Sequence, residues 1–205
     1  MLHYSTVDFE TYEILKKIFS IDLIKNRFAL AGGTSLSLQL GHRHSIDLDI
    51  FSPEVFDTRD LELTLSSTPC LKFEMINRTE RMLFSYINNV KCDFVNEPST
   101  LLNPFLSEDD VNYFHFEDIA AMKMHTVCGR GKKKDFFDIY VLLENYGWQD
   151  MLKWFASKYG ESQYYFLWRS IAYFEDAEDD VDIVGFTPYT KDWEEIKSFI
   201  KAKCV

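Results

Sequence analysis

The sequence predicts an α+β fold in which a mixed β-sheet is followed by a helical C-terminal half. Up to about residue 97, short apolar runs have the length or the two-residue period of strands. From Phe116 onward, apolar residues recur at helical spacing. Between these regions, residues 97–112 contain prolines and acidic residues that interrupt both patterns. We therefore expect a core with an N-terminal helix over residues 1–100, and a helical region over residues 101–205 that packs on this core.

The composition is that of a globular protein. Of the 205 residues, 46% are hydrophobic and 27% are charged, which excludes a disordered chain. The formal net charge of -11 excludes a broadly basic nucleic-acid-binding surface, although it leaves room for a local basic patch. No apolar run approaches the ~18 residues of a membrane span, and the N-terminus lacks the pattern of a signal peptide. With four widely separated cysteines that we interpret as reduced thiols, we expect a cytoplasmic protein that does not enter a membrane.

The first half is expected to combine short helices and strands. Helical spacing over residues 8–25 predicts an N-terminal helix, and the apolar residues 28–31 predict a strand that ends at two glycines. A short helix over 34–40, ended by Gly41, and a strand over 46–51 follow. Further strands are expected at 71–77, 82–87 and 90–95, with a tight turn at Asn88-Asn89 between the last two.

The second half is expected to consist of helices. They are predicted at residues 117–128, 134–145, 150–159, 161–175 and 191–203. Gly147 and Gly160 are expected to end helices, and Thr190 is expected to cap the last one. We interpret the acidic run at 175–182 as a solvated loop, with a docking site for a basic partner as the alternative.

A candidate nucleotide-binding turn lies between the first strand and the short helix that follows it. Gly32 and Gly33 would let a phosphate approach the backbone, and the helix N-terminus supplies free N–H groups and a positive dipole end. Thr34 or Ser35 could add a hydroxyl group. Taken alone, a Gly-Gly turn is more often a purely steric feature.

Three aspartates form the candidate catalytic and metal-binding group. Asp47 and Asp49 lie two residues apart on a strand, so that their Cβ atoms are ~6.5 Å apart on one face. Two carboxylates at this spacing can bind one hard cation such as Mg²⁺ and leave positions for water and phosphate oxygens. Asp93 points the same way as Lys91 on a later strand. If the two strands are adjacent, Asp93 completes a group that could hold two metal ions; otherwise Asp93 is a charge partner of Lys91.

The helical half contributes a second candidate group. Lys123 could neutralise phosphate charge, and Asp135 and Asp138 share one helix face because they are three residues apart. A basic run over residues 130–134 precedes them. Each of these lysines alone fits a solvated loop, whereas the run as a whole is a candidate contact for an anionic partner.

With these residues in place, the chain resembles the AbiEii/AbiGii-type abortive-infection nucleotidyltransferase toxins. The resemblance is carried by the segments FALAGGTSLSLQLGHRHSIDLDIF, VKCDFV, FEDIAAMKMHTVCGRGKKKDFFDIYVLL and IAYFEDAEDD…DWEEIKSFI, which occur in this order between residues 28 and 203. It implies a polymerase-β-like nucleotidyltransferase core followed by the helical half. It also implies a separately encoded antitoxin and, as in some relatives, a tRNA 3′ end as the acceptor.

The resemblance assigns roles to the candidate residues. Nucleotide binding is implied for Gly32, Gly33, Thr34, Ser35, Lys123, Asp135 and Asp138, and catalysis with metal binding for Asp47, Asp49 and Asp93. The expected reaction is transfer of a nucleotide from an NTP to an acceptor hydroxyl group, with Mg²⁺ or Mn²⁺ as cofactor. Two alternatives are nucleotidylation, such as AMPylation, of a protein partner, and a regulatory module that binds NTP without transferring it.

Overall fold

Strands from distant parts of the sequence form one mixed sheet. Among residues 1–204, which the computed structural model describes, this sheet has seven strands in the order β3-β4-β5-β2-β1-β7-β6. Their bounds are β1 Ala29–Leu30, β2 Leu48–Ser52, β3 Phe73–Arg78, β4 Met82–Ile87, β5 Val90–Asn96, β6 Leu106–Glu108 and β7 Val111–Tyr113. β2 pairs with β5 and β1 with β7 in parallel, and the other neighbours are antiparallel.

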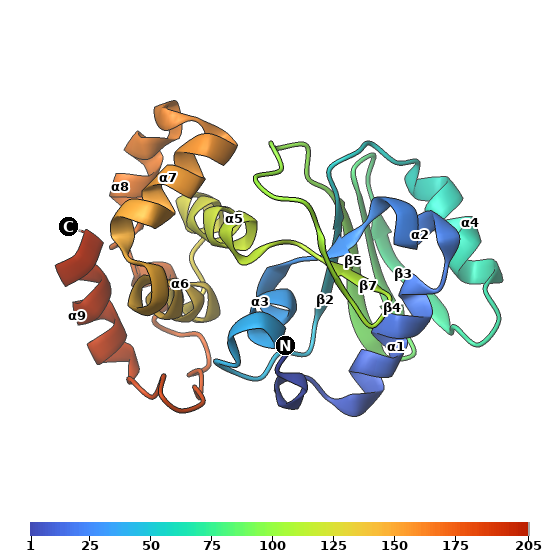
Figure 1. The fold of residues 1–205 in the computed structure, drawn as a ribbon, viewed down its shortest axis with the longest axis horizontal. Coiled ribbons are helices and arrows are strands. Elements are labelled where there is room, and N and C mark those ends of the chain that lie inside the picture. Colours follow the sequence, from blue (N-terminus) through green and yellow to red (C-terminus); the bar gives the residue numbers. More distant parts are fainter. Residues whose placement is uncertain (205) are drawn as a thin grey trace.

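Helices of the N-terminal half lie on both sides of this sheet. α1 (Phe9–Phe19), α2 (Asp22–Arg27) and α4 (Thr58–Ser67) lie on one face, and α3 (Gly32–Leu40) lies toward the other, as Figure 1 shows. The face under α1 and α4 is apolar, because Leu48 and Ile50 of β2 and Cys92 and Phe94 of β5 are fully buried in a common core. Residues that alternate with them on β2 and β5 therefore point to the opposite face.

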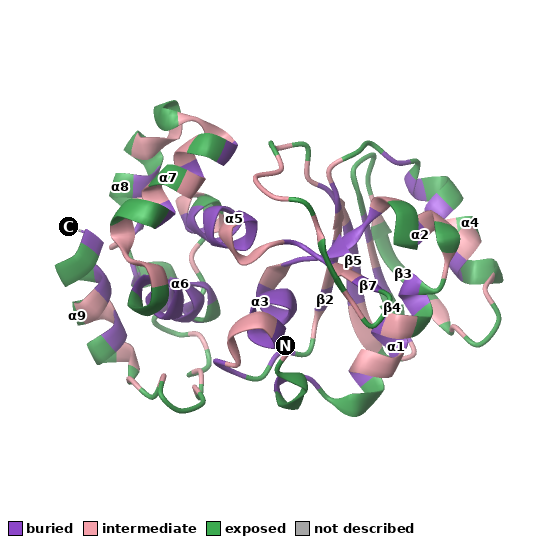
Figure 2. Ribbon diagram, in the orientation of Figure 1, coloured by how far each residue is buried: buried purple, intermediate pink, exposed green. Residues whose placement is uncertain are grey.

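The C-terminal half is a bundle of helices beside the sheet (Figure 1). Its helices are α5 Phe116–Gly129, α6 Lys133–Tyr146, α7 Trp148–Tyr159, α8 Tyr164–Ser170 and α9 Trp193–Cys204. The bundle shares a second apolar core with the sheet lobe, to which Ala29, Ala31 and Leu36 contribute. In Figure 2, α3, α5 and α6 are accordingly buried over much of their surface at the centre of the molecule. The predicted α+β fold is confirmed.

The segment between the two halves contains structure that the sequence prediction missed. β6 and β7 form a hairpin with Asp109 and Asp110 in left-handed conformations at its turn, and β7 extends the sheet beside β1. Each strand is only three residues long, too short to show a period. The sheet thus continues to Tyr113, whereas the division of the chain at residue 100 stays a prediction.

Three helix predictions need correction. The helix predicted over 8–25 is divided into α1 and α2 by extended backbone at Ile21. The helix predicted over 161–175 ends at Ser170 and is preceded and followed by short 3-10 turns. Thr190 does not cap the last helix. Instead, Asp192 accepts a hydrogen bond from the Glu195 backbone N–H and Glu195 accepts one from the Asp192 N–H, each 2.9 Å long.

A buried ion pair fixes the chain that leads from the sheet to the bundle. Asp118 in α5 and Lys158 in α7 are 2.8 Å apart with fully buried side chains. The Asp118 carboxylate also accepts hydrogen bonds from the backbone N–H groups of Leu102 and Asn103. The segment before β6 is therefore tied to two helices of the bundle.

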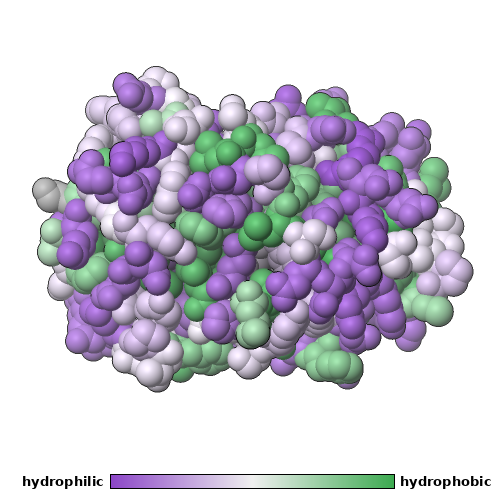
Figure 3. All heavy atoms as spheres, in the orientation of Figure 1, coloured by the Kyte–Doolittle hydropathy of each residue, from purple (hydrophilic) through white to green (hydrophobic). Residues whose placement is uncertain are grey.

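Apolar and polar side chains alternate over the face of the molecule shown in Figure 3, and several apolar side chains gather along the junction of the two lobes. None of the helices in residues 1–204 combines the length and the apolar character that a membrane crossing requires.

Candidate active site

The two lobes enclose a polar cavity of about 190 Å³. Its walls come from the turn before α3, from β2 and β5, and from α5 and α6. Of the residues predicted from the sequence, the cavity is lined by Gly32, Gly33, Asp47, Asp49, Asp93, Lys123 and Asp135. The structure therefore brings together residues from both halves that are up to about a hundred positions apart.

Asp49 and Asp93 are neighbours across the sheet. β2 and β5 are parallel and in register, so that the Cα atoms of Asp49 and Asp93 are direct partners. Because Leu48, Ile50, Cys92 and Phe94 are buried on the other face, both aspartates point into the cavity. The condition for a three-carboxylate group, adjacency of the two strands, is met. Asp47, just before β2, lines the same cavity.

The surroundings of Asp49 favour its protonated form. Burial of its carboxyl group raises the pKa of Asp49 above its ordinary value. Lys123 and Lys134 oppose this shift, while the carboxylates of Asp93 and Asp47 add to it. A cation beside Asp49 would therefore favour its charged form.

Lysines pair with the other two carboxylates. Lys134 Nζ lies 3.5 Å from Asp47 Oδ2, and Lys91 Nζ lies 2.6 Å from Asp93 Oδ2. Asp93 is thus both a member of the acidic group and a partner of Lys91. Its second oxygen, Oδ1, is buried and has no hydrogen-bond partner among the described residues. This oxygen is free to accept a proton or a cation.

The cavity meets two conditions for a hard metal ion, although a complete ligand set is not preformed. Carboxylate oxygens are the ligands that Mg²⁺ and Mn²⁺ prefer, and Asp93, whose Oδ1 has no hydrogen-bond partner among the described residues, is the register partner of Asp49. Within residues 1–204, however, no three His, Cys, Asp or Glu side chains are already grouped tightly enough to hold a metal. In this structure, lysine ammonium groups form ion pairs with the Asp47 and Asp93 carboxylates.

The two glycines are required by close contacts. Gly32 has a φ of +63°, and a Cβ atom there would lie 2.1 Å from Asp49 Oδ2. A Cβ atom on Gly33 would lie 2.4 Å from a terminal nitrogen of Arg43. Only glycine therefore lets the start of α3, with its free N–H groups, approach both the Asp49 carboxylate and the Arg43 guanidinium.

Thr34 and Ser35 do not line the cavity. Thr34 is 1% exposed, and its hydroxyl group donates to the Asp47 carbonyl oxygen and is hydrogen-bonded to the Ser45 hydroxyl group at 2.9 Å. Ser35 is fully buried, and its hydroxyl oxygen accepts a hydrogen bond from Gln39. The expectation that one of these hydroxyl groups faces a nucleotide does not match this arrangement. Thr34 instead fixes the backbone that leads into β2.

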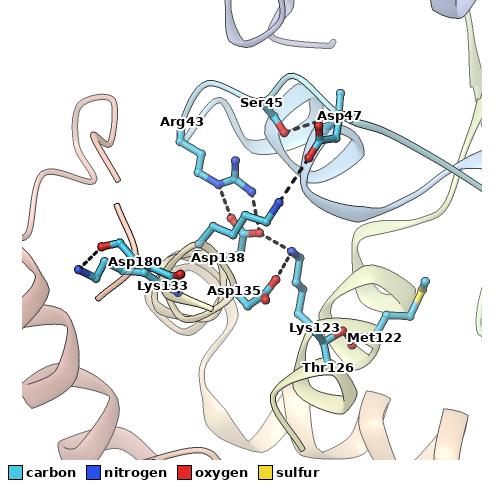
Figure 4. Close-up of polar contacts among 12 residues, drawn as sticks. Arg43, Ser45, Asp47, Met122, Lys123, Thr126, Lys133, Asp135, Asp138 and Asp180 are labelled. Carbon is cyan, nitrogen blue, oxygen red and sulfur yellow. Dashed lines mark hydrogen bonds and ion pairs between the residues drawn. The ribbon is translucent and has the colours of Figure 1, made fainter. Parts of the chain in front are cut away.

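Asp138 lies behind the cavity wall and connects several of its residues. It is fully buried and accepts hydrogen bonds from His42 at 2.8 Å and from two nitrogens of Arg43 at 2.7 and 3.0 Å. Lys123 lies 2.8 Å from both Asp138 and Asp135. Figure 4 shows Arg43, Lys123 and Asp138 pointing toward one another. Asp138 therefore holds other residues in place and has no surface of its own in the cavity.

The charges of this cluster are mutually stabilising. Burial alone would raise the pKa of Asp138, but Arg43 and Lys123 hold it well below its ordinary range. Burial would likewise lower the pKa of Lys123, yet Asp138 and Asp135 raise it. Lys123 therefore stays positively charged at the cavity wall.

The basic run over 130–134 serves two purposes. Lys133 is buried and binds the acidic run: its ammonium group contacts Asp182 and the Asp180 carbonyl oxygen, and Asp180 Oδ2 accepts its backbone N–H at the start of α6. Figure 4 includes Lys133 with Asp180. Part of the acidic run is thus bound to α6 and is not a freely solvated loop. Arg130 and Lys134, in contrast, line the cavity.

The sequence did not point to Arg43, Ser45 or Lys91 as residues of the site, although all three line the cavity. The only signal for these three residues was their position: Arg43 and Ser45 lie just before Asp47 in the sequence, and Lys91 is on the same strand face as Asp93. Neither signal distinguishes a cavity residue from an ordinary surface residue.

The fold is that of a nucleotidyltransferase. Three solved structures are similar to the chain at 12–16% identity: JHP933 from Helicobacter pylori (TM-score 0.52, covering 96% of this chain and 91% of that one), the nucleotidyltransferase toxin MenT4 from Mycobacterium tuberculosis H37Rv (0.53, 94% and 80%) and ANT(2")-Ia in complex with adenylyl-2"-tobramycin (0.57, 77% and 99%).

The sequence comparisons are more specific. The model of the family described as "Nucleotidyl transferase AbiEii toxin, Type IV TA system" matches residues 13–202. An uncharacterised protein from Aquifex aeolicus, aq_aa25, is 32% identical over 200 residues, which cover 95% of this chain and 94% of that protein. The chain belongs to the AbiEii family of nucleotidyltransferase toxins of type IV toxin–antitoxin systems, as the resemblance of its motifs implied.

Proposed function

We propose that this protein transfers a nucleotide from an NTP to an acceptor hydroxyl group on tRNA, with Mg²⁺ or Mn²⁺ as cofactor. The observation that carries this proposal is the register of β2 and β5, which places the Asp49 and Asp93 carboxylates side by side in a cavity lined by glycine backbone and by cations. Membership of the AbiEii family supports the transferase activity. It also supports a separately encoded antitoxin as a partner, to which the same proposal extends.

Asp47, Asp49 and Asp93 are the residues that would hold the metal. When bound, the metal supplies positive charge to the triphosphate and lowers the barrier for displacement at the α-phosphate. The N-terminal N–H groups of α3, next to Gly32 and Gly33, can donate hydrogen bonds to phosphate oxygens. Asp93 Oδ1, which has no hydrogen-bond partner among the described residues, can accept the proton of the acceptor hydroxyl group. The oxygen of that hydroxyl group bonds to the α-phosphorus as pyrophosphate leaves.

Cations of the cavity have a defined place in this reaction. Lys123 is held by Asp135 and Asp138 and remains charged, so it can stabilise negative charge that develops on the leaving pyrophosphate without first being ordered. Lys134 is more exposed, and its ammonium group lies 3.5 Å from Asp47. With a cation held by Asp47, the Lys134 ammonium group would be available to bind a phosphate oxygen.

The proposal is tested with purified protein, Mg²⁺, each α-labelled NTP, and a mixture of total RNA and cell lysate. We expect label in tRNA, and we expect Asp47→Ala to lower its rate of appearance at least ~1,000-fold, or about 4 kcal/mol of activation free energy. Asp150→Ala, an exposed aspartate on α7 paired with Lys153, is the matched control and should label normally. A folded Asp47→Ala variant that keeps most of its activity would refute the assignment.

One observation favours a second acceptor class. The formal net charge of -11 opposes binding of a large RNA except at local basic sites, so a protein partner is the alternative acceptor. Label in protein instead of tRNA would select it. Binding of NTP with no labelled product in any fraction would indicate a regulatory module.

A further inference from the structure

We propose that Arg43 is a phosphate-binding residue of the cavity and that Asp138 is its positioning residue. The proposal rests on the proposed function, because it assigns the triphosphate, or the pyrophosphate that leaves, to a particular side chain. It also gives Asp138 a role different from nucleotide contact.

Arg43 is held rigidly in the cavity wall. It follows α3 in the chain, is only 5% exposed, and lines the cavity. Its Nε and Nη2 donate to Asp138, and its Nη1 donates to the His44 carbonyl oxygen at 3.0 Å. A guanidinium group carries five N–H donors, so these contacts leave one N–H on each terminal nitrogen. Two donors of a fixed planar group suit bidentate binding of a phosphate.

The contact with Gly33 places these donors beside a second anion-binding element. Arg43 Nη2 lies only 2.4 Å from the position that a Cβ atom on residue 33 would take. The guanidinium group therefore lies directly against the turn that begins α3. The free N–H groups and the positive dipole end of α3 are next to the Arg43 donors. An anion in this part of the cavity meets both.

The position of Arg43 is determined from the helical half. Its carboxylate partner, Asp138, lies on α6, 95 residues further along the chain. The Arg43 backbone forms an isolated antiparallel bridge with Gly185. Next to it, the Phe186 N–H donates to the His42 carbonyl oxygen at 2.8 Å. A Cβ atom on Gly185 would lie 1.8 Å from the Tyr189 carbonyl oxygen, so only glycine fits at this end of the bridge. Arg43 is thus oriented by side-chain and backbone contacts from the other lobe.

A purely structural role for Arg43 is the competing explanation, since Arg43 and Asp138 neutralise each other. A lysine at position 43 would keep that charge pair but lose the planar fork and its spare donors. The two explanations therefore differ in what Arg43→Lys does to anion binding, as distinct from stability.

The experiment measures binding of inorganic pyrophosphate, of each NTP and of the corresponding NMP by calorimetry in the presence of Mg²⁺. We expect Arg43→Lys to raise the Kd for pyrophosphate and NTP at least ~10-fold, and that for NMP by less. Arg78→Lys, which replaces an arginine paired with Glu62 away from the cavity, is the matched control and should bind normally. An unchanged Kd in Arg43→Lys would overturn the proposal.

A second variant tests the same contact without touching either charged residue. Gly33→Ala adds a Cβ atom only 2.4 Å from the position of Arg43 Nη2, and the Gly33 backbone is not in a left-handed conformation that alanine would strain. We expect a similar rise in the pyrophosphate Kd, and we expect it to be largely absent in the Arg43→Lys background. Equal effects of Gly33→Ala in the two backgrounds would show that the alanine acts on the cavity directly, and would overturn the assignment to Arg43.

The positioning role of Asp138 has its own readout. Asp138→Asn should weaken pyrophosphate binding in the natural chain and weaken it less in the Arg43→Lys background. Asp118→Asn, which changes another fully buried aspartate in an ion pair, should reduce stability without changing the pyrophosphate Kd. Equal Asp138→Asn effects in both backgrounds would overturn the positioning role. A natural chain that binds neither pyrophosphate nor NTP and labels nothing would refute the proposed function itself.

Discussion

Replacement of Gly32 by alanine tests how strictly the first glycine of the turn controls the site. The added Cβ atom would lie 2.1 Å from Asp49 Oδ2 and 2.8 Å from Asp49 Cγ. Ordinary van der Waals contact begins near 3.4 Å, so the Asp49 carboxylate must move by about 1.3 Å. A displacement of ~1 Å in a reacting group costs on the order of 100-fold in rate. The left-handed φ of +63° adds about 1–3 kcal/mol of backbone strain for alanine.

We therefore expect Gly32→Ala to lower the rate of nucleotidyl transfer at least ~100-fold and to lower the melting temperature. Transfer is measured with α-labelled NTP on protein whose folding has been confirmed by circular dichroism. Mn²⁺ binding, followed by electron paramagnetic resonance, provides a readout that does not depend on the acceptor. It should weaken, because Asp49 is a predicted ligand.

Gly147→Ala is the matched control for backbone strain. Gly147 has a φ of +79°, but nothing lies within 4 Å of its Cβ position. This variant should lose stability and keep its rate per folded molecule. If Gly32→Ala retains transfer within about threefold of the natural chain, the close approach of the turn to Asp49 is irrelevant to catalysis and the reasoning fails.

Two further predictions concern the buried charges. Asp118→Ala leaves the Lys158 ammonium group buried without its partner. We therefore expect the free energy of unfolding, measured in urea, to fall by about 3–5 kcal/mol, and a fall below about 1 kcal/mol would contradict the importance of the pair. Burial lowers the pKa of His42 below its ordinary 6.5, and its buried Nδ1 has no partner among the described residues. The unfolded chain therefore binds the His42 proton first as pH falls below 6.5, so this residue costs stability there, by up to about 1.4 kcal/mol per pH unit. Unfolding free energies between pH 7.5 and 5 should fall more steeply for the natural chain than for His42→Asn, and equal slopes would contradict a neutral buried His42.

The sequence was sufficient for the elements that carry a clear local pattern. The alternation in residues 46–51 and 90–95 correctly predicted strands whose aspartates point away from the core. Gly147 and Gly160 end helices as predicted, since both have positive φ. The Asn88-Asn89 turn also has two left-handed residues, as the hairpin required. In each case, residues a few positions apart determine the structure.

What the sequence could not show depends on contacts between distant residues. Arg43 is held in the cavity wall by Asp138, which lies 95 positions away in the sequence. Lys133 is buried because the acidic run folds back on the start of α6. Thr34 and Ser35 have the residue types of a nucleotide-binding turn, yet the helix begins two residues before Thr34 and turns both hydroxyl groups inward.

The place of β1 between β2 and β7 in the sheet has a consequence for the order in which the protein is made. β1 has only two residues, and it needs both β2 and β7 as neighbours, although the ribosome delivers β7 long after β1. Gly32 directly follows β1, so the glycine turn acquires its fixed support only after Tyr113 has been synthesised. Asp138, which is synthesised later still, then holds Arg43 in place. A growing or prematurely ended chain therefore carries all three acidic residues well before it can carry the cavity, and it is expected to be inert as a transferase.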